Sequence, residues 1–148
     1  MPPDSDSRAG VVSPDEIILR RLLSPKPGAP ATTQIRPGIG LTATSFSLRP
    51  RRGEQYPSWS RLLLTSPERL VELAAEDGCD VRGAHVCAVA VQVVRELRLD
   101  VVPDPTPADH GHCLIVPTTR QPFTDIIWKR LAQKTRIVHT QPDGASAA

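Results

Sequence analysis

The sequence predicts an α+β fold: a small single domain with a mixed or antiparallel sheet and two to four short helices. Short apolar runs typical of strands alternate with short amphipathic runs typical of helices, but without the regular spacing of a doubly wound sheet. A chain of 148 residues suits one domain. Neither G-x-G-x-x-G nor a Walker A pattern occurs, which argues against the two commonest nucleotide-binding folds.

The domain is expected to span residues 11–140. Residues 1–10 and 141–148 are polar or small and rich in Pro, Gly, Ser, Asp and Ala, so we expect them to be disordered tails. Residues 24–40 contain four prolines and three glycines. Because such a density of breakers opposes regular structure, this segment is predicted to be an extended loop.

The first elements of the domain are short. Ser13 to Glu16 resemble a helix start, with a capping hydroxyl, a proline and two acids. Residues 17–23 could continue that helix, or residues 16–20 could form a strand, and periodicity does not decide between them. Residues 41–48 and 59–64 are predicted strands, the first because of its threonine content and alternation.

The best-supported helix begins at the Ser66-Pro67-Glu68 sequence and ends at Gly78. In the second half, a strand at 85–91 passes into a helix at 92–97. A proline-rich turn at 101–109 then precedes a strand at 112–117. A helix that begins after Thr124 and a final edge strand at 136–140 complete the prediction.

The composition favours a cytoplasmic bacterial protein without a cofactor. Three sparse cysteines suggest neither a disulfide framework nor a CxxC site. Only Lys26, Lys129 and Lys134 among the 18 basic residues are lysines, a bias typical of GC-rich bacterial coding. The N-terminal residues lack the apolar core of a signal peptide, and no apolar run is long enough for a membrane span.

A binding function is the main hypothesis. The chain has a net charge of +2 and only 3% aromatic residues, too little for a base-stacking platform or strong attraction to polyanions. We expect an accessory domain that docks on a protein or nucleoprotein partner. The alternative is an RNA- or DNA-binding module that uses the arginine cluster at 49–52. The candidate binding residues are Arg49, Arg51, Arg52, Tyr56, Trp59 and Trp128.

Two pairs of residues are considered as metal ligands. His85 and Cys87 would share one face of a strand, as would His110 and His112. If those segments paired, they would form a tetrahedral site suited to zinc. In the competing interpretation, Cys87 is a buried core residue and the histidines lie at strand ends. We expect no metal.

An enzymatic function is the other alternative, either metal-dependent or by resemblance. The order of an early arginine (Arg20 or Arg21), a Ser/Thr-rich strand (residues 44–47) and a later glutamate (Glu68 or Glu96) is similar to that of ADP-ribosyltransferases. The resemblance implies that such a glutamate is catalytic. Cys113 adjoins His112, but neighbours on a strand face opposite sides and cannot form a nucleophile–base pair.

Overall fold

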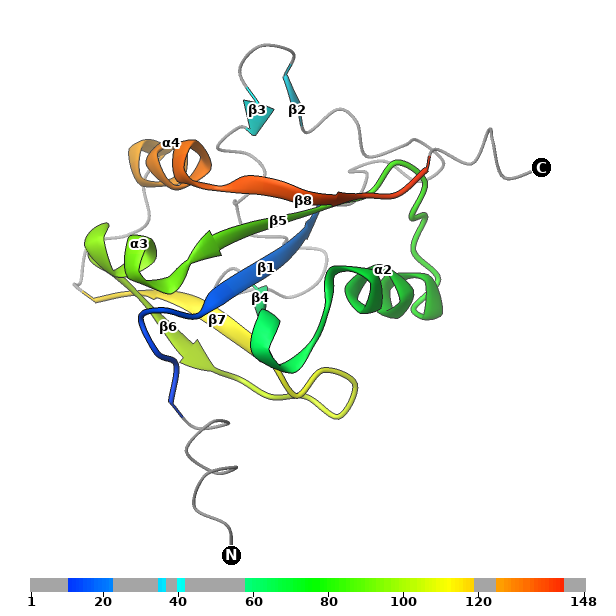
Figure 1. The fold of residues 1–148 in the computed structure, drawn as a ribbon, viewed down its shortest axis with the longest axis horizontal. Coiled ribbons are helices and arrows are strands. Elements are labelled where there is room, and N and C mark those ends of the chain that lie inside the picture. Colours follow the sequence, from blue (N-terminus) through cyan, green and yellow to red (C-terminus); the bar gives the residue numbers. More distant parts are fainter. Residues whose placement is uncertain (1–10, 23–34, 37–39, 42–57, 119–124, 143–148) are drawn as a thin grey trace, which may run out of the picture.

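A six-stranded sheet forms the centre of the molecule (Figure 1). The structure, a computed structural model, describes residues 11–22, 35–36, 40–41, 58–118 and 125–142. The strand order is β6-β7-β4-β1-β5-β8, and every neighbouring pair is antiparallel. The strands are β1 (Ile17–Leu22), β4 (Ser58–Arg61), β5 (His85–Ala90), β6 (Leu99–Pro103), β7 (His112–Pro117) and β8 (Arg136–Thr140).

Three α-helices connect strands that are not neighbours in the sheet. They are α2 (Pro67–Glu76), α3 (Val91–Glu96) and α4 (Asp125–Lys134). A 3-10 turn, η4 (Leu62–Leu64), lies between β4 and α2. The antiparallel sheet and the three helices of the described residues confirm the predicted α+β class.

The helices lie on opposite faces of the sheet (Figure 1). Leu70, Val71 and Leu73 of α2 pack with Leu19, Val86 and Ala88 of the sheet. Residues of α3 and α4, including Val94 and Leu131, pack on the opposite side with Ile18, Leu22, Val89 and Ile115. Because successive side chains of a strand point to opposite faces, β1 and β5 contribute to both clusters.

The open alternative at residues 17–23 is resolved in favour of a strand, β1. This strand is central and has buried apolar residues on both faces, Leu19 on one and Ile18 and Leu22 on the other. The predicted helix start at 13–16 is therefore wrong. Those residues form a turn instead, in which the Glu16 N–H donates to the Ser13 carbonyl at 3.1 Å and the Ser13 N–H donates to the Glu16 carboxylate at 2.7 Å.

Three further boundaries differ from the predictions. The strand expected at 59–64 ends at Arg61, where η4 begins. The turn expected at 101–109 begins with a strand, β6, which tolerates Pro103 because it lies at the sheet edge. Within the expected loop at 24–40, Ile35–Arg36 (β2) pairs with Gly40–Leu41 (β3). Residues 24–34 and 42–48, like both expected tails apart from residues 141–142, lie outside the described residues.

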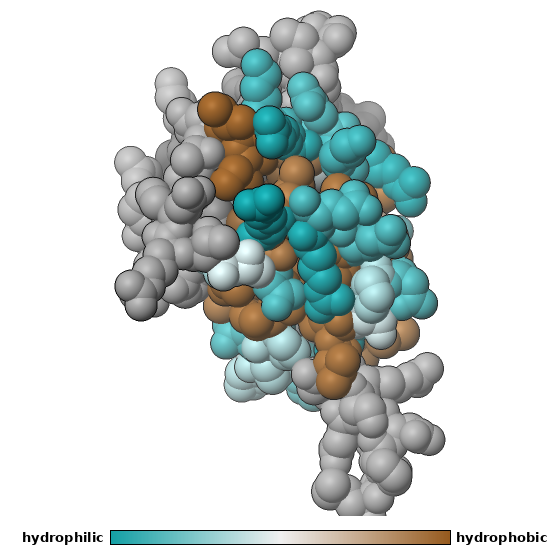
Figure 2. All heavy atoms as spheres, turned by 90° about the vertical axis from the view of Figure 1, so that its left-hand side faces the viewer, coloured by the Kyte–Doolittle hydropathy of each residue, from teal (hydrophilic) through white to brown (hydrophobic). Residues whose placement is uncertain are grey.

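Several elements are confirmed. α2 begins after Ser66, whose Oγ accepts the Arg69 N–H at 3.1 Å, as the capping pattern predicts. β5, β7 and the edge position of β8 also agree with the sequence analysis. On the side of the molecule seen in Figure 2, hydrophobic residues show between larger areas of hydrophilic ones. In the described part of the chain, no helix is both long and apolar enough to cross a membrane.

Candidate functional site: a polar pocket beside α2

A pocket with a volume of about 220 Å³ opens on the α2 face of the sheet, between α2 and the turn that joins β6 to β7. Its walls come from β1, β4, α2 and that turn. The lining residues are Leu19, Arg20, Arg21, Ser58, Trp59, Ser60, Leu70, Leu73, Asp77, Thr106, Ala108, Asp109 and His112.

The pocket exists because α2 covers only part of its face. The helix packs on β1, β5 and β8, at one end of the strand order. On this face, β4 carries Ser58 and Ser60, which are paired with Leu114 and His112 of β7, so three of these four residues are polar. The alternation therefore places polar side chains where no apolar helix face covers the sheet.

Ser60 and His112 are direct cross-strand neighbours. The next pair along, Arg61 and Gly111, is joined by a hydrogen bond from the Arg61 N–H to the Gly111 carbonyl at 2.8 Å. Since hydrogen-bonded and non-hydrogen-bonded pairs alternate in an antiparallel ladder, Ser60 and His112 form a non-hydrogen-bonded pair. Side chains approach each other most closely in such pairs.

A carboxylate holds each of these two side chains. The Ser60 hydroxyl donates to Asp109 Oδ2 at 2.5 Å, and Asp109 Oδ1 accepts the Gly111 N–H at 3.0 Å. His112 Nδ1 lies 2.9 Å from the Asp104 carbonyl oxygen and 3.1 Å from Asp104 Oδ2. Both partners of Nδ1 are acceptors, so Nδ1 carries the proton and Nε2 of the neutral ring is an acceptor.

Gly111 lets the turn approach η4. A Cβ atom at this position would lie 3.0 Å from Leu64 Cβ and 3.2 Å from the Arg61 carbonyl oxygen. The neighbouring atoms would have to move by a few tenths of an ångström to accommodate it. The glycine therefore keeps Asp109 and His112 close to β4.

Two arginines border the pocket, but only Arg21 is on the α2 face, because Arg20 is paired with the core residue Cys87 on the opposite face. Arg20 Nη1 donates to the Ser58 carbonyl at 2.8 Å, and Arg21 Nη1 donates to the Leu70 carbonyl at 3.3 Å. Asp77 and Asp109 line the same pocket, so it contains charges of both signs. Such a site suits a polar ligand or a reaction in which charge develops locally.

The predicted binding residues do not gather at this pocket. Arg49, Arg51, Arg52 and Tyr56 lie outside the described residues. Trp59 and Trp128 are 1% and 6% exposed and belong to the hydrophobic core. Trp59 is buried because the strand alternation that directs Ser60 to the open face directs Trp59 to the covered one.

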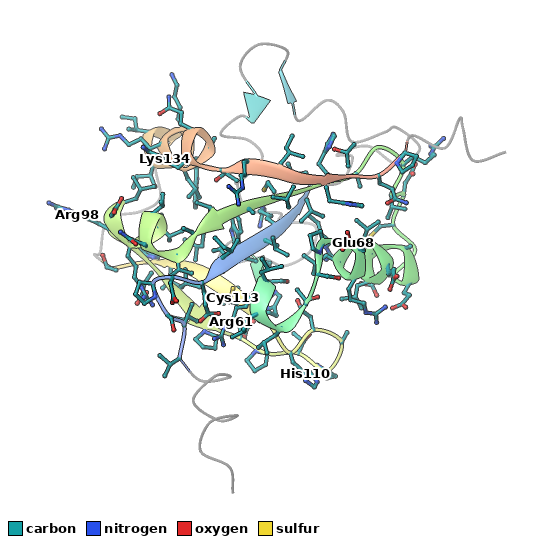
Figure 3. All side chains as sticks on the ribbon, viewed as in Figure 1. Arg61, Glu68, Arg98, His110, Cys113 and Lys134 are labelled. Atoms are coloured by element: carbon teal, nitrogen blue, oxygen red, sulfur yellow. The ribbon has the colours of Figure 1, made fainter. Side chains whose placement is uncertain are left out.

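The four metal candidates do not converge. His85 and Cys87 are on β5, whereas His112 is on β7 and His110 lies just before it (Figure 3); β1 and β4 separate the two strands. His85 Nδ1 lies 2.9 Å from Thr140 Oγ1, and Cys87 is a buried core residue. Within the described ranges, no group of three or more His, Cys, Asp or Glu side chains is arranged to hold a metal ion.

The residues of the ADP-ribosyltransferase resemblance are also dispersed. Arg20 and Arg21 line the pocket, but Glu68 and Glu96 do not. Glu68 is exposed at the start of α2 (Figure 3), and Glu96 ends α3 on the other face of the sheet. Residues 44–47 lie outside the described part of the chain.

Cys113 lies on the covered face with Trp59, opposite His112. Burial raises the pKa of its thiol to about 12, so it is not a reactive thiolate.

The sequence analysis missed Ser60, Asp104 and Asp109. A signal for Ser60 was the alternation of Trp59, Ser60 and Arg61, which directs a polar residue away from the tryptophan side. Asp104 and Asp109 lay within a turn interpreted only as a connection.

Comparison of the chain with protein-family models, curated proteins and solved structures gives no match.

Proposed function

We propose that this chain is an accessory domain that docks on a protein partner in the bacterial cytoplasm. The observation that carries the proposal is η4, in which Leu62, Leu63 and Leu64 are 40%, 49% and 38% exposed. Isolated exposed apolar residues are normal, whereas a contiguous exposed apolar group is typical of interaction surfaces. The arginine-rich composition and sparse cysteines support the bacterial and cytoplasmic setting.

The η4 turn (Leu62–Leu64), called the leucine turn below, is held in place by the residues around it. Arg61, immediately before η4, is 1% exposed and forms an ion pair with Glu16 at 2.7 Å. Leu64 packs beside Gly111, where an added methyl group would lie only 3.0 Å from Leu64 Cβ. A fixed apolar surface loses little entropy on binding, which favours docking.

The charges beside the turn indicate the chemistry of the partner. Exposed acids lie on α2, which follows η4, and Asp104 lies in the β6–β7 turn, whose Gly111 is next to Leu64. Arg69 forms ion pairs with Glu72 and Glu76, so acidic groups remain in excess along α2. We therefore propose a partner surface with apolar side chains flanked by lysines and arginines. The acidic groups on α2 would repel the phosphates of a nucleic acid, so this face is not suited to bind one.

The test combines affinity capture from the native host with two variants. A Leu62→Ser/Leu63→Ser/Leu64→Ser variant should lose the captured protein, and the affinity of the purified pair should fall about 30-fold or more, as for a hot-spot truncation of about 2 kcal/mol. The control is Ile137→Ser/Val138→Ser, which changes comparably exposed residues (37% and 41%) on β8. It should retain binding within about threefold, an effect below that of a hot spot.

Two outcomes would contradict the proposal. One is a partner that binds both variants equally. The other is capture of RNA or DNA with a steep salt dependence that disappears when Arg49, Arg51 and Arg52 are all replaced, which would instead support the nucleic-acid alternative.

A further inference from the structure

We infer that the pocket beside α2 is a catalytic site for the hydrolysis of acyl esters, with Ser60 as the nucleophile and His112 as the general base. This activity goes beyond the docking function and does not depend on the leucine turn. It rests on four side chains that the β4–β7 pairing and the β6–β7 turn bring together: Ser60, Asp104, Asp109 and His112.

The Asp104–His112 pair has the geometry of an oriented base. Asp104 accepts from Nδ1 with both its carbonyl oxygen (2.9 Å) and Oδ2 (3.1 Å), which fixes the tautomer and limits rotation of the ring. Nε2 is then free of a proton in the neutral ring. A carboxylate in this position also stabilises the imidazolium that forms when Nε2 takes a proton.

The side chains of Ser60 and His112 project from directly paired positions on the same face of the sheet. Ser60 is 5% exposed and lines the pocket, and its cross-strand neighbour is His112. In the resting structure the hydroxyl donates to Asp109. A change of the Ser60 χ1 rotamer would redirect Oγ, and hydrogen bonds between catalytic groups are often formed only when substrate binds.

The charges of the pocket suit the transition state. Arg21 lines the same pocket as Ser60 and lies on the same face of the sheet. Positive charge near the substrate carbonyl would stabilise the oxyanion that develops when Oγ attacks. Cys113, next in sequence to His112, cannot replace Ser60 because it faces the covered side of the sheet.

The reaction needs only the ester and water. Ser60 Oγ forms a bond to the carbonyl carbon while His112 Nε2 takes the hydroxyl proton. The bond from carbon to the leaving oxygen then breaks, and His112 returns the proton to that oxygen. Water next attacks the acyl-serine and gives a proton to His112. The Oγ–carbon bond breaks, Ser60 regains its proton and the acid leaves.

The test uses the purified full chain with two probes, p-nitrophenyl acetate and an alkyl fluorophosphonate. We expect one fluorophosphonate adduct per chain, located on Ser60 by peptide mass spectrometry and absent from Ser60→Ala. Ser60→Ala and His112→Ala should each slow ester hydrolysis by about 100-fold or more, the usual size of a general-base contribution. Circular dichroism and thermal unfolding establish that each variant is folded.

His110→Ala is the matched control. This exposed histidine precedes His112 by two residues and does not line the pocket. Since free imidazole groups also hydrolyse activated esters, the control separates an oriented base from an exposed one. We expect it to retain both the wild-type rate and the adduct.

The inference would be overturned by the absence of an adduct on the folded wild-type chain, by an adduct on another residue, or by equal rates for His110→Ala and His112→Ala. A folded Ser60→Ala variant with the wild-type rate would also exclude Ser60 as the nucleophile. None of these results bears on docking through Leu62–Leu64, so the two proposals fail separately.

Discussion

The two faces of the sheet differ in how completely helices cover them. On the α3/α4 face, residues from β1, β4, β5, β6 and β7 join the two helices in one hydrophobic cluster. On the α2 face, the apolar cluster is confined to α2 and residues of β1 and β5. The part of that face formed by β4 and β7 carries Ser60 and His112 instead, and the pocket lies there. Helix α2 thus covers β1, β5 and β8 on this face and leaves β4 and His112 accessible from the pocket.

Strand β4 belongs to both environments at once. Trp59 points to the covered face and is 1% exposed, whereas Ser60 points to the open face beside α2. Arg61 returns to the Trp59 side, where Glu16 neutralises its charge. Three consecutive residues therefore serve the core, the candidate site and a buried ion pair.

The largest expected effect is the loss of Trp59. Replacing this core side chain with alanine should lower the free energy of unfolding by about 3–5 kcal/mol, because it removes apolar burial and leaves a cavity. Ser60→Ala should cost only about 1 kcal/mol, the usual size of one hydrogen bond. Urea unfolding measures both changes.

Similar stability losses at the two positions would break the comparison between the covered and open faces. A Trp59→Phe variant supplies a control that keeps an aromatic ring. Trp59→Phe should be more stable than Trp59→Ala. If the two variants are equally stable, the aromatic ring contributes nothing to the core.

The buried Arg61–Glu16 ion pair should produce the next largest effect. Arg61 Nε and Nη2 donate to the two Glu16 carboxylate oxygens at 2.7 and 2.8 Å, and the side chains are 1% and 9% exposed. Glu16→Gln would leave the arginine charge buried without its counterion, which should cost about 3 kcal/mol in urea unfolding. The control is Asp80→Asn, which breaks an exposed pair with Arg82 and should leave stability unchanged.

Acid should also destabilise the wild type, because protonation of Glu16 removes the counterion of Arg61. Desolvation acts to raise the pKa of Glu16, but hydrogen bonds from Arg61 and Ser13, with the charges of Arg61 and Arg95, outweigh it and lower the pKa below 4.5. Because the folded-state pKa is the lower one, the stabilisation is present above pH 4.5 and is lost as the pH falls through the folded value. A Glu16→Gln variant that loses stability in acid as steeply as the wild type would show that Glu16 is not responsible.

The sequence predicted the elements whose signals are local. The cap at Ser66, the apolar face of α2 and the strands β5 and β7 follow from propensity and periodicity. β1 was ambiguous because only its position in the centre of the sheet explains burial on both faces. β6 was missed because prolines indicate turns, and only an edge position makes Pro103 acceptable.

The candidate site depends on contacts between distant residues. Ser60 and His112 are 52 positions apart in the chain and meet only through the β4–β7 register. Asp109 and Asp104 acquire their roles from a turn whose path Gly111 permits. No local pattern encodes that register, so sequence analysis found His112 as one half of a metal pair and did not single out Ser60.

The smallest expected effect tests the end of the sheet remote from the pocket, where His85 is 7% exposed on β5. Burial lowers the pKa of His85 from 6.5, and the neighbouring His139 adds to the shift. The unfolded state therefore binds the proton first, so stability should decline as the pH falls below 6.5 and level off below the folded-state pKa. Thermal unfolding between pH 7.5 and 5.5 should show a steeper decline for the wild type than for His85→Gln, which does not titrate. If His85→Gln keeps the wild-type slope, burial of His85 has no part in the acid response.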